Sequence, residues 1–125
     1  MTQESRRCRV LLVEDEFLLC DMVAEALIEH GFEVHAVANG EDAVRHLGSG
    51  AACDVLLTDI NLPGALDGTA LAERARVIHP DLPVVYATGS AHRIEQIRAV
   101  TGSVLVPKPY DPNKLCAMLG HMLAN

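Results

Sequence analysis

Hydrophobic and polar positions along the chain alternate between short apolar runs and longer segments of helical period. The run at 9–13 is valine and leucine after Arg9, which predicts a buried strand. Beyond it, apolar residues recur at i, i+3, i+4, i+7 and i+8, the spacing of a helix that buries one face. These residues are Leu19, Met22, Val23, Ala26 and Leu27. Gly31 is typical of the position just past a helix end.

The same alternation continues to the end of the chain. Further strands are expected at 33–37, 54–58, 83–87 and 103–106. Helices are expected after Asn39, after Gly68, at about 92–100 and after Asp111. The positions predicted to face inward on these helices are Ala43, Val44, Leu47, Leu71, Ala75, Ile78, Leu115, Met118, Leu119 and Met122.

The order of these elements, strand and helix in turn, predicts the fold class. Strands that are continuous apolar runs are buried on both faces, which is typical of a parallel sheet between two helical layers. Right-handed crossovers make a doubly wound α/β sheet the expected arrangement. A chain of 125 residues has the length of one domain, so we expect a single domain over 1–125 with its core at about 9–123.

Composition excludes several classes of protein. Half of the residues are hydrophobic and 22% are charged, which is ordinary for a folded domain and unlike a disordered chain. The formal net charge of −7 argues against nucleic acid or an anionic membrane as the main partner. No apolar run approaches the roughly 18 residues of a membrane span, and no signal peptide is evident, so a cytoplasmic location is expected.

The four cysteines, Cys8, Cys20, Cys53 and Cys116, are widely spaced along the chain. They include no CxxC pair and match no zinc-ligand spacing, so we expect reduced thiols and not a disulfide framework. The six histidines show no ligand spacing among themselves and are interpreted as surface residues.

Polar side chains follow four of the five predicted strands. Glu14 and Asp15 follow the first, Asp59 the third, Thr88 the fourth and Lys108 the fifth. Taken singly, each has an ordinary explanation as a helix cap, a turn residue or a solvated charge. In doubly wound sheets, functional groups lie beyond the carboxyl ends of the strands, so we expect these five side chains to lie together.

Such a group of side chains suits a magnesium-dependent phosphoryl site. Two carboxylates about 4 Å apart repel each other by several kcal/mol, and a bound cation relieves that repulsion. Oxygen ligands without histidine or cysteine favour Mg²⁺. Lys108 and Thr88 would then bind phosphoryl oxygens. Asp59, alone at the end of the central strand, is the candidate nucleophile.

Four motifs, in this order and at these separations, carry a resemblance to a known family. They are VLLVEDE at 10–16, LLTDINLPG at 56–64 with a following DG, YATGS at 86–90 and PKPY at 107–110. Through them the chain resembles the receiver domain of two-component response regulators from about 9 to 123. The resemblance implies a flavodoxin-like (βα)5 fold with strand order 2-1-3-4-5.

The resemblance also implies how the acidic residues act. Asp59 would accept a phosphoryl group from a phosphohistidine of a sensor kinase or of a histidine phosphotransfer protein. The expected ion is Mg²⁺, with Mn²⁺ as a substitute. Its expected protein ligands are Asp15, Asp59 and the backbone carbonyl of Asn61, with Glu14 acting on the ion through a water molecule.

The remaining motif residues receive roles in the same way. Thr88 and Lys108 would bind phosphoryl oxygens, and the Lys108–Pro109 peptide bond is expected to be cis. Glu16 is interpreted as the start of the first helix and not as a third acidic ligand, since the helix dipole favours a negative charge there.

Three positions depart from the family pattern or would tune its chemistry. Leu105 stands where the family usually has an aromatic switch residue on the last strand, which puts the usual coupling to Thr88 in question. Tyr86 stands where a sub-group of stand-alone receivers has the phenylalanine of Phe-Ala-Thr-Gly, and it is either a substitute for that phenylalanine or a residue suited to strand packing alone. Ser90 and Asn61 would flank the path of the attacking water and tune the phosphoryl lifetime. The LPGALDG loop at 62–68 is one residue longer than the family pattern.

We therefore expect a stand-alone phosphorylation switch or phosphorelay shuttle, since nothing after Leu123 could bind DNA. Its chemistry would be limited to its own phosphorylation and dephosphorylation, so it would not be an enzyme in the usual sense. Phe17, Leu18 and Cys20 are expected on the outer side of the first helix, where they could contact the kinase.

Three alternatives remain open at the level of sequence. The chain could be a pseudo-receiver, a binding module that phosphorylation does not control. It could also be a receiver excised from a hybrid histidine kinase. An aspartyl-phosphate phosphatase is a third alternative, but those enzymes usually have a general acid two residues after the nucleophile, where this chain has Asn61.

Overall fold

The computed structural model describes residues 7–89 and 98–124, and within them five parallel strands form one sheet. The strands are β1 (Arg9–Val13), β2 (Glu33–Val37), β3 (Val55–Asp59), β4 (Val84–Thr88) and β5 (Val104–Pro107). They lie in the order β2-β1-β3-β4-β5, and every neighbouring pair is parallel. The predicted fold class and strand order are confirmed.

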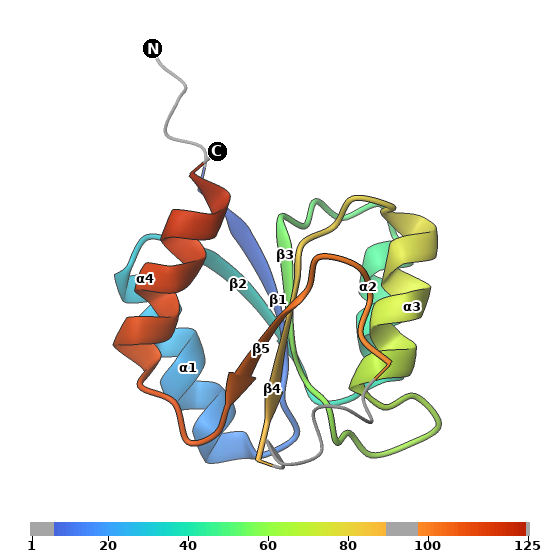
Figure 1. The fold of residues 1–125 in the computed structure, drawn as a ribbon, viewed down its shortest axis with the longest axis horizontal. Coiled ribbons are helices and arrows are strands. Elements are labelled where there is room, and N and C mark those ends of the chain that lie inside the picture. The colour runs from blue at the N-terminus through green and yellow to red at the C-terminus, as the bar shows by residue number, and fades with distance from the viewer. Residues whose placement is uncertain (1–6, 90–97, 125) are drawn as a thin grey trace.

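Helices cover both faces of the sheet (Figure 1). The described residues form α1 (Phe17–Glu29), α2 (Gly40–Gly48), α3 (Gly68–Ile78) and α4 (Pro112–Leu123). Figure 1 shows α1 and α4 on one face and α2 and α3 on the other. Most of the helix expected at 92–100 lies outside the described residues, and 98–100 have no regular secondary structure.

Two helices begin at the capping residues that the sequence predicts. The Asn39 side chain accepts a hydrogen bond from the Asp42 backbone N–H at the start of α2. The Asp111 side chain accepts one from the Asn113 N–H at the start of α4. Each bond satisfies a backbone donor that has no partner within its helix.

The hydrophobic core has two halves, one on each face of the sheet. Alternate strand residues point to opposite faces, so β1 contributes Val10 and Leu12 to one half and Leu11 and Val13 to the other. The first half is closed by α1 and α4, and the second by α2 and α3. All four β1 residues are buried, as expected for a central parallel strand.

Two residues predicted to face inward lie at the surface instead. Met22 is 58% exposed, because the inward stripe of α1 is turned toward α4 and includes Cys20 and Ala24. Cys20, expected on the outer side, therefore packs partly into the core. Ile78 is 40% exposed, since it is the last residue of α3 and the buried Leu82 closes that end of the core.

None of the helices within 7–89 and 98–124 has the length and apolar character that crossing a bilayer requires.

Candidate functional site

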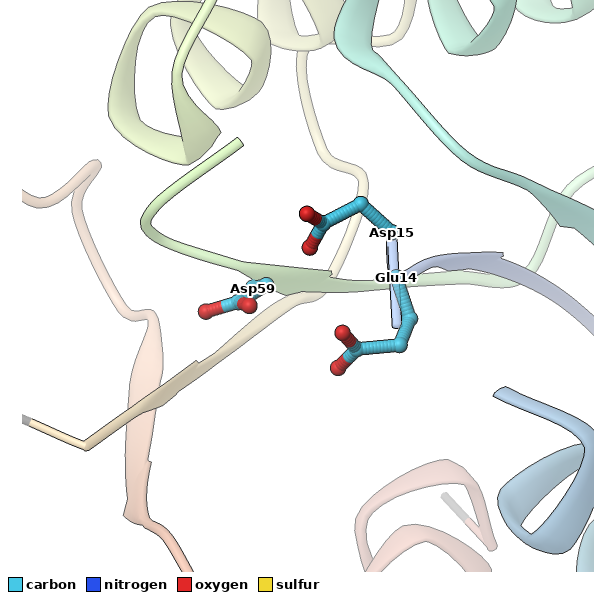
Figure 2. A group of neighbouring side chains, drawn as sticks. All are labelled: Glu14, Asp15 and Asp59. Carbon is cyan, nitrogen blue, oxygen red and sulfur yellow. The ribbon is translucent and has the colours of Figure 1, made fainter. Parts of the chain in front are cut away.

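Three carboxylates gather where β1 and β3 end. Glu14 and Asp15 follow β1 directly, and Asp59 is the last residue of β3. The parallel register pairs Val13 with Thr58, so the acids that follow stand at the same level of the sheet. One oxygen of each acid lies within 4.8 Å of the others, and Figure 2 shows the three side chains beside one another.

The environments of these acids differ. Glu14 is 5% exposed and Asp59 is 8% exposed, whereas Asp15 is open to solvent. The group therefore combines two buried negative charges with one that solvent can reach. Burial weakens the screening of charge by water, so a nearby cation is held more strongly here than at an open surface.

Lys108 reaches the same acids from the end of β5. Its Nζ lies 2.9 Å from Glu14 Oε1 and 3.0 Å from Asp59 Oδ2. Burial by itself would lower the pKa of Lys108, but the hydrogen bonds to Glu14 and Asp59 and their negative charges raise it above its ordinary value. The side chain is therefore an ammonium ion that offsets part of the repulsion between the acids.

Thr88 ends β4 and is buried. The register pairs Asp59 with Ala87, which puts Thr88 one residue beyond the level of Asp59. The Thr88 backbone carbonyl accepts a hydrogen bond of 2.7 Å from the Lys108 N–H, which joins the ends of β4 and β5. The peptide bond between Lys108 and Pro109 is cis.

The other predicted residues take up distinct positions around the acids. The Asn61 backbone N–H donates to Asp59 Oδ1 at 3.4 Å. Glu16 is the N-cap of α1, and its backbone N–H donates to Glu14 Oε2 at 3.0 Å, so it stands at the start of the helix as expected. Ser90 lies outside the described residues.

The donor set fits a small, hard divalent cation. The acids Glu14, Asp15 and Asp59 offer oxygen atoms, which is the ligand type that such ions prefer in proteins. Lys108 supplies one positive charge against three negative ones, so a divalent ion would bring the group close to neutrality. The exposed side, toward Asp15, leaves room for the waters that such an ion usually retains.

Tyr110 borders the site, although its place in the sequence indicated no role for it. Burial raises the pKa of Tyr110 to about 12, with Lys108 acting against this rise and the charges of Glu14, Asp59 and Cys20 adding to it. Its ring packs against the core half formed by α1 and α4. The phenol therefore stays protonated beside the acids. The PKPY motif contained this residue, but a motif does not say which side chains line a site.

Tyr86 and Leu105, the two positions at which the sequence departs from the aromatic switch of the family, are neighbours in the sheet. They are paired in the register of β4 and β5, and both belong to the core half formed by α2 and α3. The Tyr86 hydroxyl accepts a hydrogen bond of 3.1 Å from the Val100 backbone N–H. Tyr86 is therefore a packed core residue that also holds the segment before β5.

Comparisons of the sequence and of the structure with known proteins point to the same family. A family model described as response regulator receiver domain matches residues 10–120. The sensor kinase CckA of Brucella abortus (strain 2308) is 30% identical over 125 residues, which are 98% of this chain and 13% of that protein. The chain thus spans about an eighth of the length of this relative.

Receiver domains are found among the solved structures of similar fold. A response regulator receiver protein from Sinorhizobium medicae WSM419 is 31% identical, with a TM-score of 0.85 over 95% of this chain and 96% of that one. The receiver domain of sensor histidine kinase PA1611 from Pseudomonas aeruginosa PAO1 is 25% identical, with a TM-score of 0.85 over 96% and 100% of the two chains. That structure has a magnesium ion in its active-site cleft. By the match to most of its length, this chain belongs to the response regulator receiver domain family.

Proposed function

We propose that this protein is a phosphorylation-dependent signalling receiver whose phosphoacceptor is Asp59. The observation that carries the proposal is the position of the Asp59 carboxylate, 3.0 Å from the Lys108 ammonium and within 4.8 Å of oxygens of Glu14 and Asp15. A nucleophile, a fixed cation and a second acidic pair at one sheet edge are the components of a phosphoryl-transfer site.

The chemistry follows from these neighbours. An Asp59 oxygen attacks the phosphorus of a phosphohistidine, the new O–P bond forms as the P–N bond breaks, and the electron pair returns to the imidazole. Lys108 and Thr88 would bind oxygens of the transferred group, so the protein contributes positioning and electrostatic stabilisation. Water later hydrolyses the acyl phosphate and restores Asp59. We propose no other turnover reaction for this chain.

Mg²⁺ is the ion that we propose for the acidic group. The magnesium-bound receiver of PA1611 supports this assignment, as does the set of oxygen donors here. Glu14, Asp15, Asp59 and the backbone carbonyl of Asn61 would hold it, with Mn²⁺ as a substitute. Bound Mg²⁺ would neutralise negative charge on the phosphoryl oxygens.

The exposed apolar side chains at the start of α1 provide a contact surface for the phosphoryl donor. Phe17 is 73% exposed and Leu18 is 71% exposed. They follow Asp15 by two and three residues, respectively. Large apolar side chains at an exposed position beside a reactive site are typical of a docking surface. We propose that a helix of a histidine kinase or of a histidine phosphotransfer protein docks here, which is consistent with the likeness to receivers of sensor kinases.

The test of phosphorylation is intact-protein mass spectrometry after incubation with acetyl phosphate and Mg²⁺. We expect a gain of one phosphoryl group that EDTA prevents and that Asp59→Asn abolishes. Asp81→Asn, which removes an exposed acid elsewhere in the chain, is the matched control and should leave the gain intact. If the natural sequence gains no mass with any small phosphoryl donor, the proposal fails and a pseudo-receiver is favoured. Multiple turnover on a phosphomonoester would favour the phosphatase instead.

The docking surface is tested by comparing two kinds of donor. Leu18→Asp should slow phosphoryl transfer from a phosphorylated histidine phosphotransfer protein and leave transfer from acetyl phosphate unchanged. Val77→Asp replaces another highly exposed apolar residue, on α3, and is the matched control. Equal rates for Leu18→Asp and the control would count against this surface.

A further inference from the structure

The loop between β3 and α3 is closed at its base beside Asp59. The Gly68 backbone N–H donates to the Ile60 carbonyl at 2.7 Å, so residues 60 and 68 are held together. A Cβ atom on Gly68 would lie 2.1 Å from the Asp59 backbone oxygen, which shows how closely the two ends approach. The loop that begins after Asp59 therefore ends beside the Asp59 and Ile60 backbone.

A residue of another helix holds the middle of this loop. Glu41 is the second residue of α2, and its Oε2 accepts a hydrogen bond of 2.9 Å from the Ala65 backbone N–H. The two residues are 24 positions apart in the sequence. The bond therefore ties α2 to a loop that belongs to the next strand–helix connection.

Two glycines allow this contact. Gly64 has a φ of +89°, and a Cβ built on it would lie 3.0 Å from both carboxylate oxygens of Glu41. A Cβ on Gly40 would lie 2.8 Å from the Leu66 Cβ and 2.9 Å from its carbonyl oxygen. Any larger residue at either position would push the loop and the start of α2 apart.

The same loop begins at the residue that contacts the phosphoacceptor. The Asn61 backbone N–H lies 3.4 Å from Asp59 Oδ1, a long hydrogen bond whose length depends on where the loop lies. Asn61 is exposed, so burial does not hold it in place. A tie in the middle of the loop restricts the backbone at its start, because few torsions separate residues 61 and 65.

We propose that Glu41 is a positioning residue for the phosphoryl site. By holding the Ala65 N–H, it keeps the loop at 61–67 against α2 and keeps the Asn61 backbone beside the Asp59 carboxylate. This inference rests on the proposed function, because Asn61 is proposed there to supply a backbone ligand for Mg²⁺. Loss of the tie loosens that ligand, weakens Mg²⁺ binding and opens the acyl phosphate to water.

The experiment compares two substitutions at one position. Glu41→Ala removes the acceptor, whereas Glu41→Gln removes the same negative charge near the start of α2 but keeps an oxygen that accepts from Ala65. Both variants therefore lose the interaction of this charge with the helix dipole and its contribution to the field at the site. Glu29→Ala, which removes an exposed acid at the end of α1, is the control for net charge.

Mg²⁺ affinity, measured by titration calorimetry, and the lifetime of the phosphorylated protein are the two readouts. We expect Glu41→Ala to raise the Kd for Mg²⁺ by about threefold to tenfold, the factor that one hydrogen bond can carry. The phosphoryl lifetime should shorten in the same variant. Glu41→Gln and the control should stay within about twofold of the natural sequence, so that the glutamine variant rescues the alanine one.

Several outcomes would overturn the inference. An unchanged Mg²⁺ affinity in Glu41→Ala is the first. An equal loss of Mg²⁺ affinity in Glu41→Ala and Glu41→Gln is the second, because it would make the negative charge responsible and not the hydrogen bond. If Glu41→Ala does not fold, Gly64→Ala displaces the Glu41 carboxylate and must reproduce the loss of affinity. If the natural sequence binds Mg²⁺ but accepts no phosphoryl group, the proposed function fails while the affinity comparison still decides the role of Glu41.

Discussion

At the scale of single residues, Lys108 stands between two buried carboxylates, at 2.9 Å from Glu14 and 3.0 Å from Asp59. Lys108→Met would leave these negative charges facing each other without a cation. We expect the free energy of unfolding in EDTA to fall by about 2 kcal/mol, less than for a fully buried ion pair because the ammonium is partly exposed. Urea denaturation measures this. Lys114→Met, on the exposed side of α4, is the control, and an equal loss in both variants would contradict the prediction.

A second residue-scale feature is a pair of histidines that the sequence did not predict. The rings of His35 on β2 and His46 on α2 stack with centroids 3.8 Å apart and planes at 10°. They border a cavity of about 270 Å³ whose lining includes Arg9 and Glu33, which form an ion pair of 3.5 Å. Two neutral rings stack favourably, whereas two imidazolium ions in this position would repel each other.

This pair predicts a pH dependence of stability. Burial, and then the charge of His35, lower the pKa of His46, so the folded protein binds a proton at this residue less readily than the unfolded chain does. The free energy of unfolding should therefore decrease as the pH falls from about 7.5 to 5.5, across the ordinary pKa of histidine. His46→Gln should reduce that decrease, as followed by thermal denaturation, while His79→Gln should not. An equal dependence of stability on pH in both variants would contradict the assignment of this effect to His46.

At the scale of elements, the start of α3 is built against the end of β3. A Cβ on Gly68 would meet the Asp59 backbone oxygen at 2.1 Å, whereas one on Gly120, inside α4, would meet nothing within 4 Å. Gly68→Ala should therefore destabilise the protein by about 3 kcal/mol or more, since backbone must move to relieve the overlap. Gly120→Ala should stabilise it by about 0.5–1 kcal/mol. Chemical denaturation of both variants checks this, and a harmless Gly68→Ala would show that the contact is not this close.

At the scale of the whole molecule, the acidic group should link ion binding to folding. An ion that binds only the folded protein stabilises it by mass action, by about 2.7 kcal/mol at a concentration one hundred times its Kd. We expect Mg²⁺ to raise the melting temperature and EDTA to reverse the rise. Asp59→Asn should reduce the effect, whereas the exposed acid variant Asp81→Asn should keep it. Equal stabilisation of both variants would place the ion elsewhere.

Much of this molecule follows from local patterns in the chain. The alternation of apolar strands with helical segments predicts the class of sheet, and parallel strands end at the same edge. This is why Glu14, Asp59 and Lys108, up to 94 positions apart, could be expected to meet, and their contacts now bear this out. Roles in phosphoryl transfer were inferred from the residue types at the strand ends and from the family resemblance, and they are proposals for experiment.

Other features were decided only by tertiary structure. Helical spacing shows that one face of α1 is buried, but the packing of α4 decided that the stripe includes Cys20 and leaves Met22 in solvent. The stacking of His35 on His46 and the bond from Ala65 to Glu41 join elements whose relative positions depend on the crossovers between them. Local sequence determines the period of an element and the residues at its ends. Which side chains then touch depends on the docking of elements distant in the chain, since that docking is the balance of packing over the whole core.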